Sequence, residues 1–243
     1  MPSILGSIRN GFLKFFGDLK VFPYPLFLLY DPGSYQVKGD DIRRLISTVE
    51  PGDILIRGYK NYLDGYFIPG HFSHAGLYLG EVKDINLHLT EKGKEFYREG
   101  EQMVIHSMAE GVFMEDVINF CRCDFLIVVR RNKRTEPNLD LSKDNPAIFT
   151  KALSSLGEGY DFKFDFSEYH NMSCTEFVYY CCEEYISKYN VYLKQKRALF
   201  AKIEAIIPDD FVTEEFDIVF QSKSVKQEKL DKIISKNRAD KRL

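Results

Sequence analysis

The stretch Ser173-Cys-Thr-Glu-Phe-Val-Tyr179 carries most of the fold prediction, because it has the pattern of a helix start with a cysteine in its first turn. Ser173 and Glu176 have capping-box spacing, in which the serine side chain accepts a backbone hydrogen bond and the glutamate returns one. Cys174 is then the first helical residue. Amides and the dipole at a helix N-terminus lower a thiol pKa from its free value of about 8.5. The alternative is an unreactive cysteine buried for packing.

Two histidines lie in predicted strands where they could serve this cysteine. The helix dipole alone moves a thiol pKa by less than about one unit, so an imidazole partner is required. The stretch Phe72-Ser-His-Ala-Gly-Leu-Tyr-Leu-Gly80 alternates, which places His74 and Gly76 on one face and the leucines on the other. Small Gly76 leaves room beside the imidazole for another element, such as a helix N-terminus. If the strand Met103-Val-Ile-His-Ser107 pairs with it in antiparallel fashion, His106 stands across from or beside His74; singly, each histidine could be a structural residue.

The order of elements predicts an α+β domain with an antiparallel sheet formed first and helices on one side of it. The predicted strands are 53–57, 73–79, 102–107 and 125–130, and the predicted helices are 40–47, 146–156 and 173–188. The charged insertion 81–101 is either a lid or partner loop or a solvated connection.

Composition excludes several classes of protein. With 243 residues, 44% of them hydrophobic, the chain fits one globular domain with extensions or at most two small domains. A net charge of -3 gives no general attraction to nucleic acid. The five cysteines are odd in number and favour a reducing compartment. Cys121 and Cys123 lack zinc-knuckle spacing, so we expect small buried residues there and no metal.

The two ends of the chain differ from the middle. Residues 1–20 predict an amphipathic helix that either docks on the core or contacts a membrane peripherally. No stretch approaches the ~20 apolar residues that span a bilayer, and no clean signal peptide is present. We therefore expect a soluble, cytoplasmic protein. From residue 223 onward the basic, weakly apolar sequence predicts a solvated helix or a disordered tail.

Taken together, these blocks resemble the NlpC-type papain-like cysteine hydrolases in their circularly permuted, YiiX-like branch, over roughly residues 50 to 212. The matching blocks, in chain order, are Pro51-Gly-Asp-Ile-Leu-Ile56, Ser73-His-Ala-Gly-Leu-Tyr-Leu-Gly80, Val104-Ile-His-Ser107 with Glu110-Gly111-Val112, Gly159-Tyr-Asp-Phe162, Ser173-Cys-Thr-Glu-Phe-Val-Tyr179 and Pro208-Asp-Asp-Phe211. The cysteine block follows both histidines, as in a permuted chain. The implied fold is α+β and papain-like, with an antiparallel sheet packed against helices and the nucleophile at a helix N-terminus.

The resemblance also implies roles for individual residues. It implies that Cys174 is the nucleophile, His74 the general base and acid, and His106 the orienting residue, with no metal or cofactor. Many members of the permuted branch carry Glu at the third position, so His106 departs from that pattern and matches the unpermuted proteins. Tyr160 resembles a tyrosine near the active cysteine, where its hydroxyl serves the substrate or the oxyanion; alternatively it is only a packed aromatic.

Three functions remain open at this point. The first is an amidase or peptidase that acts on cell-wall-like peptides or small conjugates through an acyl-enzyme. The second is a lipid or acyl-ester hydrolase or acyltransferase at a membrane surface, motivated by residues 1–20 and the apolar segment 21–30. The third is a non-catalytic binding module, against which the intact cysteine and histidines count. We expect an N-terminal extension over 1–48, the hydrolase domain over 49–215 and a basic tail over 216–243.

Overall fold

The computed structural model describes residues 35–60, 70–83, 89–163, 166, 169–197 and 202–240, and describes 19–23, 26–30, 197, 202 and 203 by their backbone alone. Its centre is a six-stranded antiparallel sheet in the order β10-β7-β3-β4-β5-β6. The strands are β3 (Ile54–Gly58), β4 (His74–Val82), β5 (Gly100–Met108), β6 (Gly111–Asp116), β7 (Phe125–Arg130) and β10 (Asp217–Gln221). Two small sheets pair β1 (Leu19–Pro23) with β2 (Leu26–Tyr30) and β8 (Lys194–Arg197) with β9 (Lys202–Ala205).

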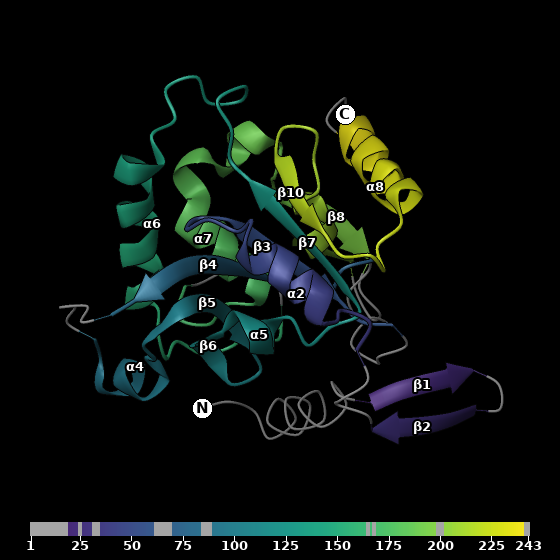
Figure 1. The fold of residues 1–243 in the computed structure, drawn as a ribbon, viewed down its shortest axis with the longest axis horizontal. Helices are drawn as coiled ribbons and strands as arrows, with labels where there is room; N and C mark the ends of the chain where they lie inside the picture. The colour runs from purple at the N-terminus through teal and green to yellow at the C-terminus, as the bar shows by residue number, and fades with distance from the viewer. Residues whose placement is uncertain are drawn as a thin grey trace.

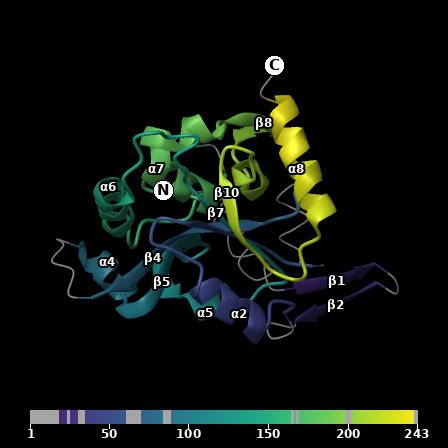
Figure 2. The same cartoon turned by 45° about the horizontal axis from the view of Figure 1, so that its top comes forward.

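Strand alternation divides the core into two layers, one on each face of the sheet. Ile54 and Ile56 of β3 join one buried cluster, and Leu55 between them joins the other. The first cluster also contains residues of α6 (Leu141–Ser154), α7 (Cys174–Ile186) and α8 (Gln227–Asp240). The second contains residues of α2 (Gly39–Ile46) and α5 (Val117–Phe120). The sheet therefore lies between two sets of helices (Figure 2), and the prediction of helices on one side is wrong.

The remaining elements are short. They are α4 (Glu91–Phe96), the 3-10 turn η1 (Ser187–Tyr189) and the 3-10 turn η2 (Pro208–Phe211). The helix α4 lies within the charged insertion predicted as a lid or a solvated connection, of which residues 84–88 fall outside the described residues.

The four predicted strands are present; β7 has the predicted ends, and the ends of the other three are shifted by one to three residues. β6 and β10 were not predicted. Helix α6 begins at Leu141 rather than at Pro146, so that Pro146 lies inside it. A proline is usually found in the first turn of a helix, and that preference misplaced the start.

The predicted domain limits are also corrected. The sheet extends past residue 215 through β10, and Leu230 and Ile233 of α8 are buried in the core, so this part of the predicted basic tail belongs to the domain. On the N-terminal side, Val37 and Leu45 are buried in the second cluster, before the predicted start at 49. The predicted amphipathic helix over 1–20 falls almost entirely outside the described residues, and membrane contact there stays a prediction.

Candidate active site

His74 and His106 meet on the face of the sheet that α2 and α5 cover. His74 is the first residue of β4, and β5 pairs with β4 so that Leu77 lies opposite Ile105. His74 Nε2 lies 2.8 Å from His106 Nδ1, within hydrogen-bond distance. The rings are nearly perpendicular, at 83° with centroids 4.9 Å apart. The predicted pairing of the two histidine strands is confirmed, with the imidazoles in direct contact.

Gly76 leaves room for the contact between His74 and His106, whereas the sequence analysis expected it to leave room for a helix N-terminus. A Cβ at Gly76 would lie 2.9 Å from a ring carbon of Phe120 and 3.0 Å from the Cβ of His106. The space above Gly76 is thus filled by Phe120 of α5 and by His106 itself. Helix α7, expected to approach there, packs on the opposite face. Gly76 is small so that His106 and an aromatic ring fit beside the strand.

A carboxylate and a guanidinium continue the polar chain beyond His106. One carboxylate oxygen of Glu115, on β6, lies 2.9 Å from His106 Nε2 and 3.6 Å from Nη1 of Arg57. The carboxylate approaches Nε2 obliquely, outside strict hydrogen-bond geometry, and Nε2 has no other hydrogen-bond partner in the described part of the chain. Arg57 is held by a 2.9 Å hydrogen bond to the carbonyl oxygen of Phe120 and lies over its ring, 4.3 Å from the centroid.

Glu115 and Arg57 are the site residues that the sequence analysis missed. The signal for Glu115 was present, because the strand Gly111–Asp116 alternates Val112 and Met114 with Phe113 and Glu115. In the observed register His106 lies opposite Phe113, which places Phe113 and Glu115 on the histidine face. The sequence analysis did not predict this strand, so it had no register from which to place Glu115 beside His106.

Cys174 begins α7, as predicted. The Ser173 side chain accepts from the Glu176 amide, and the Glu176 carboxylate accepts from the Ser173 amide, so the capping box is complete. The backbone amides of Ala75 and Thr175 lie close enough to the Cys174 sulfur to lower the pKa of the thiol, against the larger effect of burial. Because Ala75 follows His74 directly, this contact places the sulfur at the beginning of β4. Among the described residues, no hydrogen bond joins the sulfur to either imidazole.

Burial dominates the electrostatics of these groups. It raises the pKa of the Cys174 thiol to about 11, against the smaller lowering effect of the Ala75 amide. The predicted lowering is therefore wrong for this state, because loss of water outweighs the helix N-terminus. Burial lowers the pKa of His74 well below its usual value, and lowers that of His106 despite the opposing effect of Glu115. The resting site thus pairs a neutral thiol with neutral imidazoles.

Tyr160 lies in a segment that is joined to the residues preceding Cys174. Its neighbour Gly159 forms an isolated parallel bridge with Asn171, and the Met172 amide donates to the Gly159 carbonyl at 2.9 Å. The Tyr160 ring packs against Phe162, with centroids 4.8 Å apart. Tyr160 therefore lies in the segment beside the start of α7. A role of its hydroxyl toward the substrate stays a prediction.

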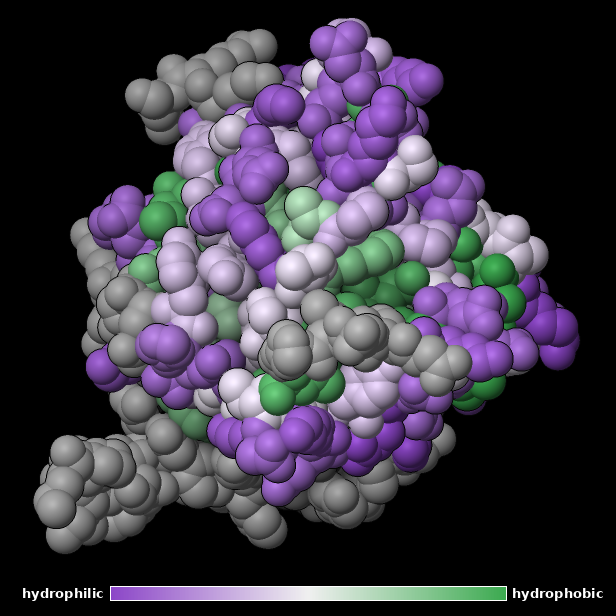
Figure 3. All heavy atoms as spheres, turned by 90° about the vertical axis from the view of Figure 1, so that its left-hand side faces the viewer, coloured by the Kyte–Doolittle hydropathy of each residue, from purple (hydrophilic) through white to green (hydrophobic). Residues whose placement is uncertain are grey.

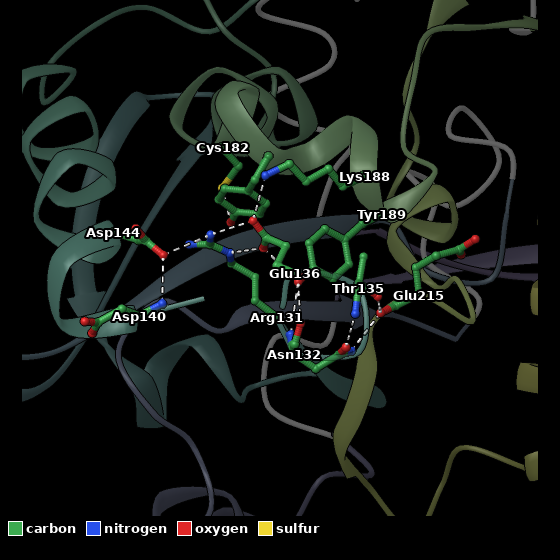
Figure 4. Close-up of polar contacts among 11 residues, drawn as sticks. Arg131, Asn132, Thr135, Glu136, Asp140, Asp144, Cys182, Lys188, Tyr189 and Glu215 are labelled. Carbon is green, nitrogen blue, oxygen red and sulfur yellow. Dashed lines mark hydrogen bonds and ion pairs between the residues drawn. The ribbon is translucent and has the colours of Figure 1, made fainter. Parts of the chain in front are cut away.

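A second polar cluster lies near the other end of α7 (Figure 4). Arg131 forms a two-point ion pair with Glu136, at 2.8 and 3.1 Å, and its guanidinium carbon lies 3.8 Å from the centre of the Tyr185 ring. Glu136 also accepts from Lys188 and from the hydroxyl of Tyr189. The cluster lines a cavity of about 440 Å³ between α6 and α7.

This cavity is separate from the candidate active site. Tyr185, which lines it, lies about 16 Å further along the helix axis than Cys174, from the 1.5 Å rise per residue. The charged groups of the polar cluster are paired with one another, so we assign this cluster a structural role: it joins the segment after β7 to α7.

On the side of the molecule that carries α6, hydrophobic side chains are exposed in small groups among hydrophilic ones (Figure 3).

Neither a metal centre nor a membrane span is found in the described ranges. No group of three or more His, Cys, Asp or Glu side chains there could hold a metal ion, and every helix is too short or too polar to cross a bilayer. Cys121 and Cys123 are buried free thiols that flank the turn between α5 and β7.

The antiparallel sheet, the strand-borne histidines and the later helix that begins with Cys174 define a papain-like protein of permuted chain order. The chain belongs to the family described as permuted papain-like amidase enzymes, YaeF/YiiX, C92, whose model matches residues 48–233. Among solved structures, it is similar to the metalloprotein YiiX of Escherichia coli O157:H7, at 15% identity and a TM-score of 0.43, over 61% of this chain and 72% of that one. No curated protein sequence matches the chain.

Proposed function

We propose that this protein is a cysteine hydrolase that cleaves an amide bond through an acyl-enzyme on Cys174. His74 serves as general base and then general acid, and His106 orients it. The observation that carries the proposal is the 2.8 Å contact between His74 Nε2 and His106 Nδ1. That contact occupies Nε2 and leaves Nδ1 as the ring nitrogen for the thiol, on a residue whose neighbour Ala75 lies close to the sulfur. Membership in an amidase family supports the same chemistry.

The reaction follows from the neutral resting pair. His74 Nδ1 takes the thiol proton as the sulfur attacks the amide carbonyl carbon, and the carbonyl oxygen becomes an oxyanion. Amides at the start of α7, including that of Cys174, stabilise this charge. The tetrahedral intermediate expels the amine, which takes the proton from His74, and a thioester remains. Water then attacks the thioester with His74 as base, which releases a carboxylic acid and restores the thiol.

The substrate class that we propose is a peptide or small amide conjugate of the cell-wall-peptide type. The basis is the amidase chemistry of the family. An activated ester is the practical probe, because the thiol of a cysteine hydrolase that attacks amides also attacks such an ester. The reaction releases a coloured phenol.

The test is site-selective acylation by p-nitrophenyl acetate, followed by peptide mapping. All five cysteines are buried, so burial alone predicts that all five are inert, and Cys121, Cys123, Cys181 and Cys182 serve as internal controls. We expect a burst of p-nitrophenol with the acetyl group on Cys174. The burst should disappear in Cys174→Ala and fall sharply in His74→Ala. If Cys174 is acetylated no faster than the other four cysteines, the proposed function is wrong.

A further inference from the structure

The contacts of Glu115 extend the two imidazoles into a longer polar chain. A carboxylate oxygen of Glu115 lies 2.9 Å from His106 Nε2, and His106 Nδ1 lies 2.8 Å from His74 Nε2. His106 has no exposed surface, whereas the Glu115 side chain is 20% exposed. Both nitrogens of a fully buried imidazole thus face a polar neighbour, and each neighbour restricts where the ring proton can lie.

The direction of the chain follows from the chemistry of its outer end. An ionised carboxylate accepts hydrogen bonds and donates none. Burial raises the pKa of Glu115, but its contact with His106 and the charge of Arg57 lower the pKa overall, so that the carboxyl is ionised at neutral pH. A neutral His106 beside this carboxylate carries its proton on Nε2, and its Nδ1 is then a lone pair. That lone pair accepts the Nε2 proton of His74, which leaves Nδ1 of His74 unprotonated.

Arg57 fixes this arrangement from the other side. Its Nη1 lies 3.6 Å from the same Glu115 oxygen and donates to the Phe120 carbonyl, and its side chain is only 4% exposed. A buried cation in this position favours the ionised carboxylate and holds it over His106. The carboxylate oxygen is within hydrogen-bond distance of Nε2, and rotation of the carboxyl group would align the bond.

We propose that Glu115 is a positioning residue that sets the tautomers of His106 and His74, so that the base nitrogen facing the nucleophile is kept free of its proton. This inference rests on the proposed function of Cys174 and His74. Without the carboxylate, His106 is free to carry its proton on Nδ1. That proton would face His74 Nε2, and a neutral His74 would then carry its own proton on Nδ1, where it blocks the general base.

The first test reads the tautomers in the unaltered protein. Long-range proton–nitrogen NMR spectra of protein labelled with 15N-histidine distinguish Nδ1–H from Nε2–H rings, and a His106→Gln spectrum assigns the signals. We expect Nε2–H for His106 and for His74. A His106 ring protonated on Nδ1 overturns the proposal without any change at Glu115.

The second test uses variants of Glu115 in the acetylation assay. Glu115→Met keeps the length of the side chain and removes its acceptor, and should slow acetylation of Cys174 by about 10- to 100-fold, the range known for carboxylates that orient metal-bound histidines. Glu115→Gln retains an acceptor oxygen and should recover most of the rate. Glu101→Met is the matched control, because Glu101 is exposed near the start of β5, away from the polar chain, and it should leave the rate unchanged.

The outcomes separate the two proposals. Failure of unaltered protein to acetylate Cys174 selectively contradicts the proposed function. Selective acetylation that is equally fast in Glu115→Met, with the His106 tautomer unchanged, leaves the function standing and overturns the role of Glu115. A slow Glu115→Met variant whose NMR signals show His106 protonated on Nδ1 supports both.

Discussion

The hydroxyl group of Ser107 donates a hydrogen bond of 2.5 Å to the carbonyl oxygen of Met172. Ser107 follows His106 on β5, and Met172 lies two residues before Cys174. Because neighbouring residues of a strand point to opposite faces, His106 reaches His74 on one face while Ser107 reaches the start of α7 on the other. This bond therefore ties the segment that precedes Cys174 to the strand that carries His106.

Ser107→Ala tests this tie. The substitution leaves the buried Met172 carbonyl without its partner, which should cost about 1–3 kcal/mol in the free energy of unfolding and slow the acetylation of Cys174. The control is Ser154→Ala, which removes an exposed hydroxyl bonded to the Lys151 carbonyl at 2.9 Å. Urea unfolding and the p-nitrophenol burst give the two quantities. Equal bursts in the two variants would contradict the tie.

The pH profile of Cys174 acetylation should be flat where that of an ordinary thiol is steep. Burial lowers the pKa of His74 well below its usual value, so the base form persists under mildly acidic conditions. Burial raises the pKa of Cys174 to about 11, so an unassisted thiolate would fall about thirtyfold between about pH 7.5 and about pH 6.0. We expect a nearly constant rate in the unaltered protein and the steep fall in His74→Ala. A thirtyfold fall in the unaltered protein would show that His74 does not assist.

Glu176 should make stability depend on pH. Burial raises its pKa to about 7, so the folded protein holds a proton there that the unfolded chain releases near its ordinary pKa of 4.5. The stability from this group is present below about pH 4.5 and is lost as pH rises through about 7. Relative to Glu176→Gln, the unaltered protein should lose at most about 3 kcal/mol between about pH 5 and about pH 8.

The control for this prediction is Glu184→Gln, which changes an exposed carboxyl of the same helix. Its stability curve should run parallel to that of the unaltered protein in thermal unfolding. A Glu176→Gln curve that is also parallel would mean that Glu176 ionises normally in the folded state.

Gly76→Ala should displace the histidine pair. The new Cβ would lie 2.9 Å from the Phe120 ring and 3.0 Å from the Cβ of His106, and crowding of this kind costs about 1–3 kcal/mol. The acetylation rate should fall as well, because His106 must shift. Gly39→Ala is the control, since its Cβ would meet only the flexible tip of Arg43 at 3.4 Å. An unchanged rate in Gly76→Ala would show that the pair tolerates displacement.

The parts of the fold that follow from local patterns could be predicted from the sequence. The capping box placed the start of α7 at Cys174, and alternation placed the leucines of β4 away from His74. The pairing of β4 with β5 followed from two short strands close in the chain. The family resemblance supplied the papain-like order, which the match over residues 48–233 bears out.

The parts that depend on distant neighbours could not be predicted. The pKa of Cys174 rises because of everything packed around the sulfur, which no capping motif records. Glu115 acquires its partner only through the register of β6, and the role of Gly76 depends on Phe120 arriving from α5. β10 joins the sheet from a charged C-terminal region whose composition suggested a tail.

The permuted order of the chain has a consequence during synthesis. The imidazoles stand on neighbouring strands 32 residues apart, whereas Cys174 enters with α7, long after both have been translated. A nascent polypeptide on the ribosome thus carries both imidazoles before the thiol of Cys174 exists. In the proposed mechanism, hydrolytic competence is added at a late stage of translation, when α7 docks on the five strands that precede it and before β10 joins the sheet.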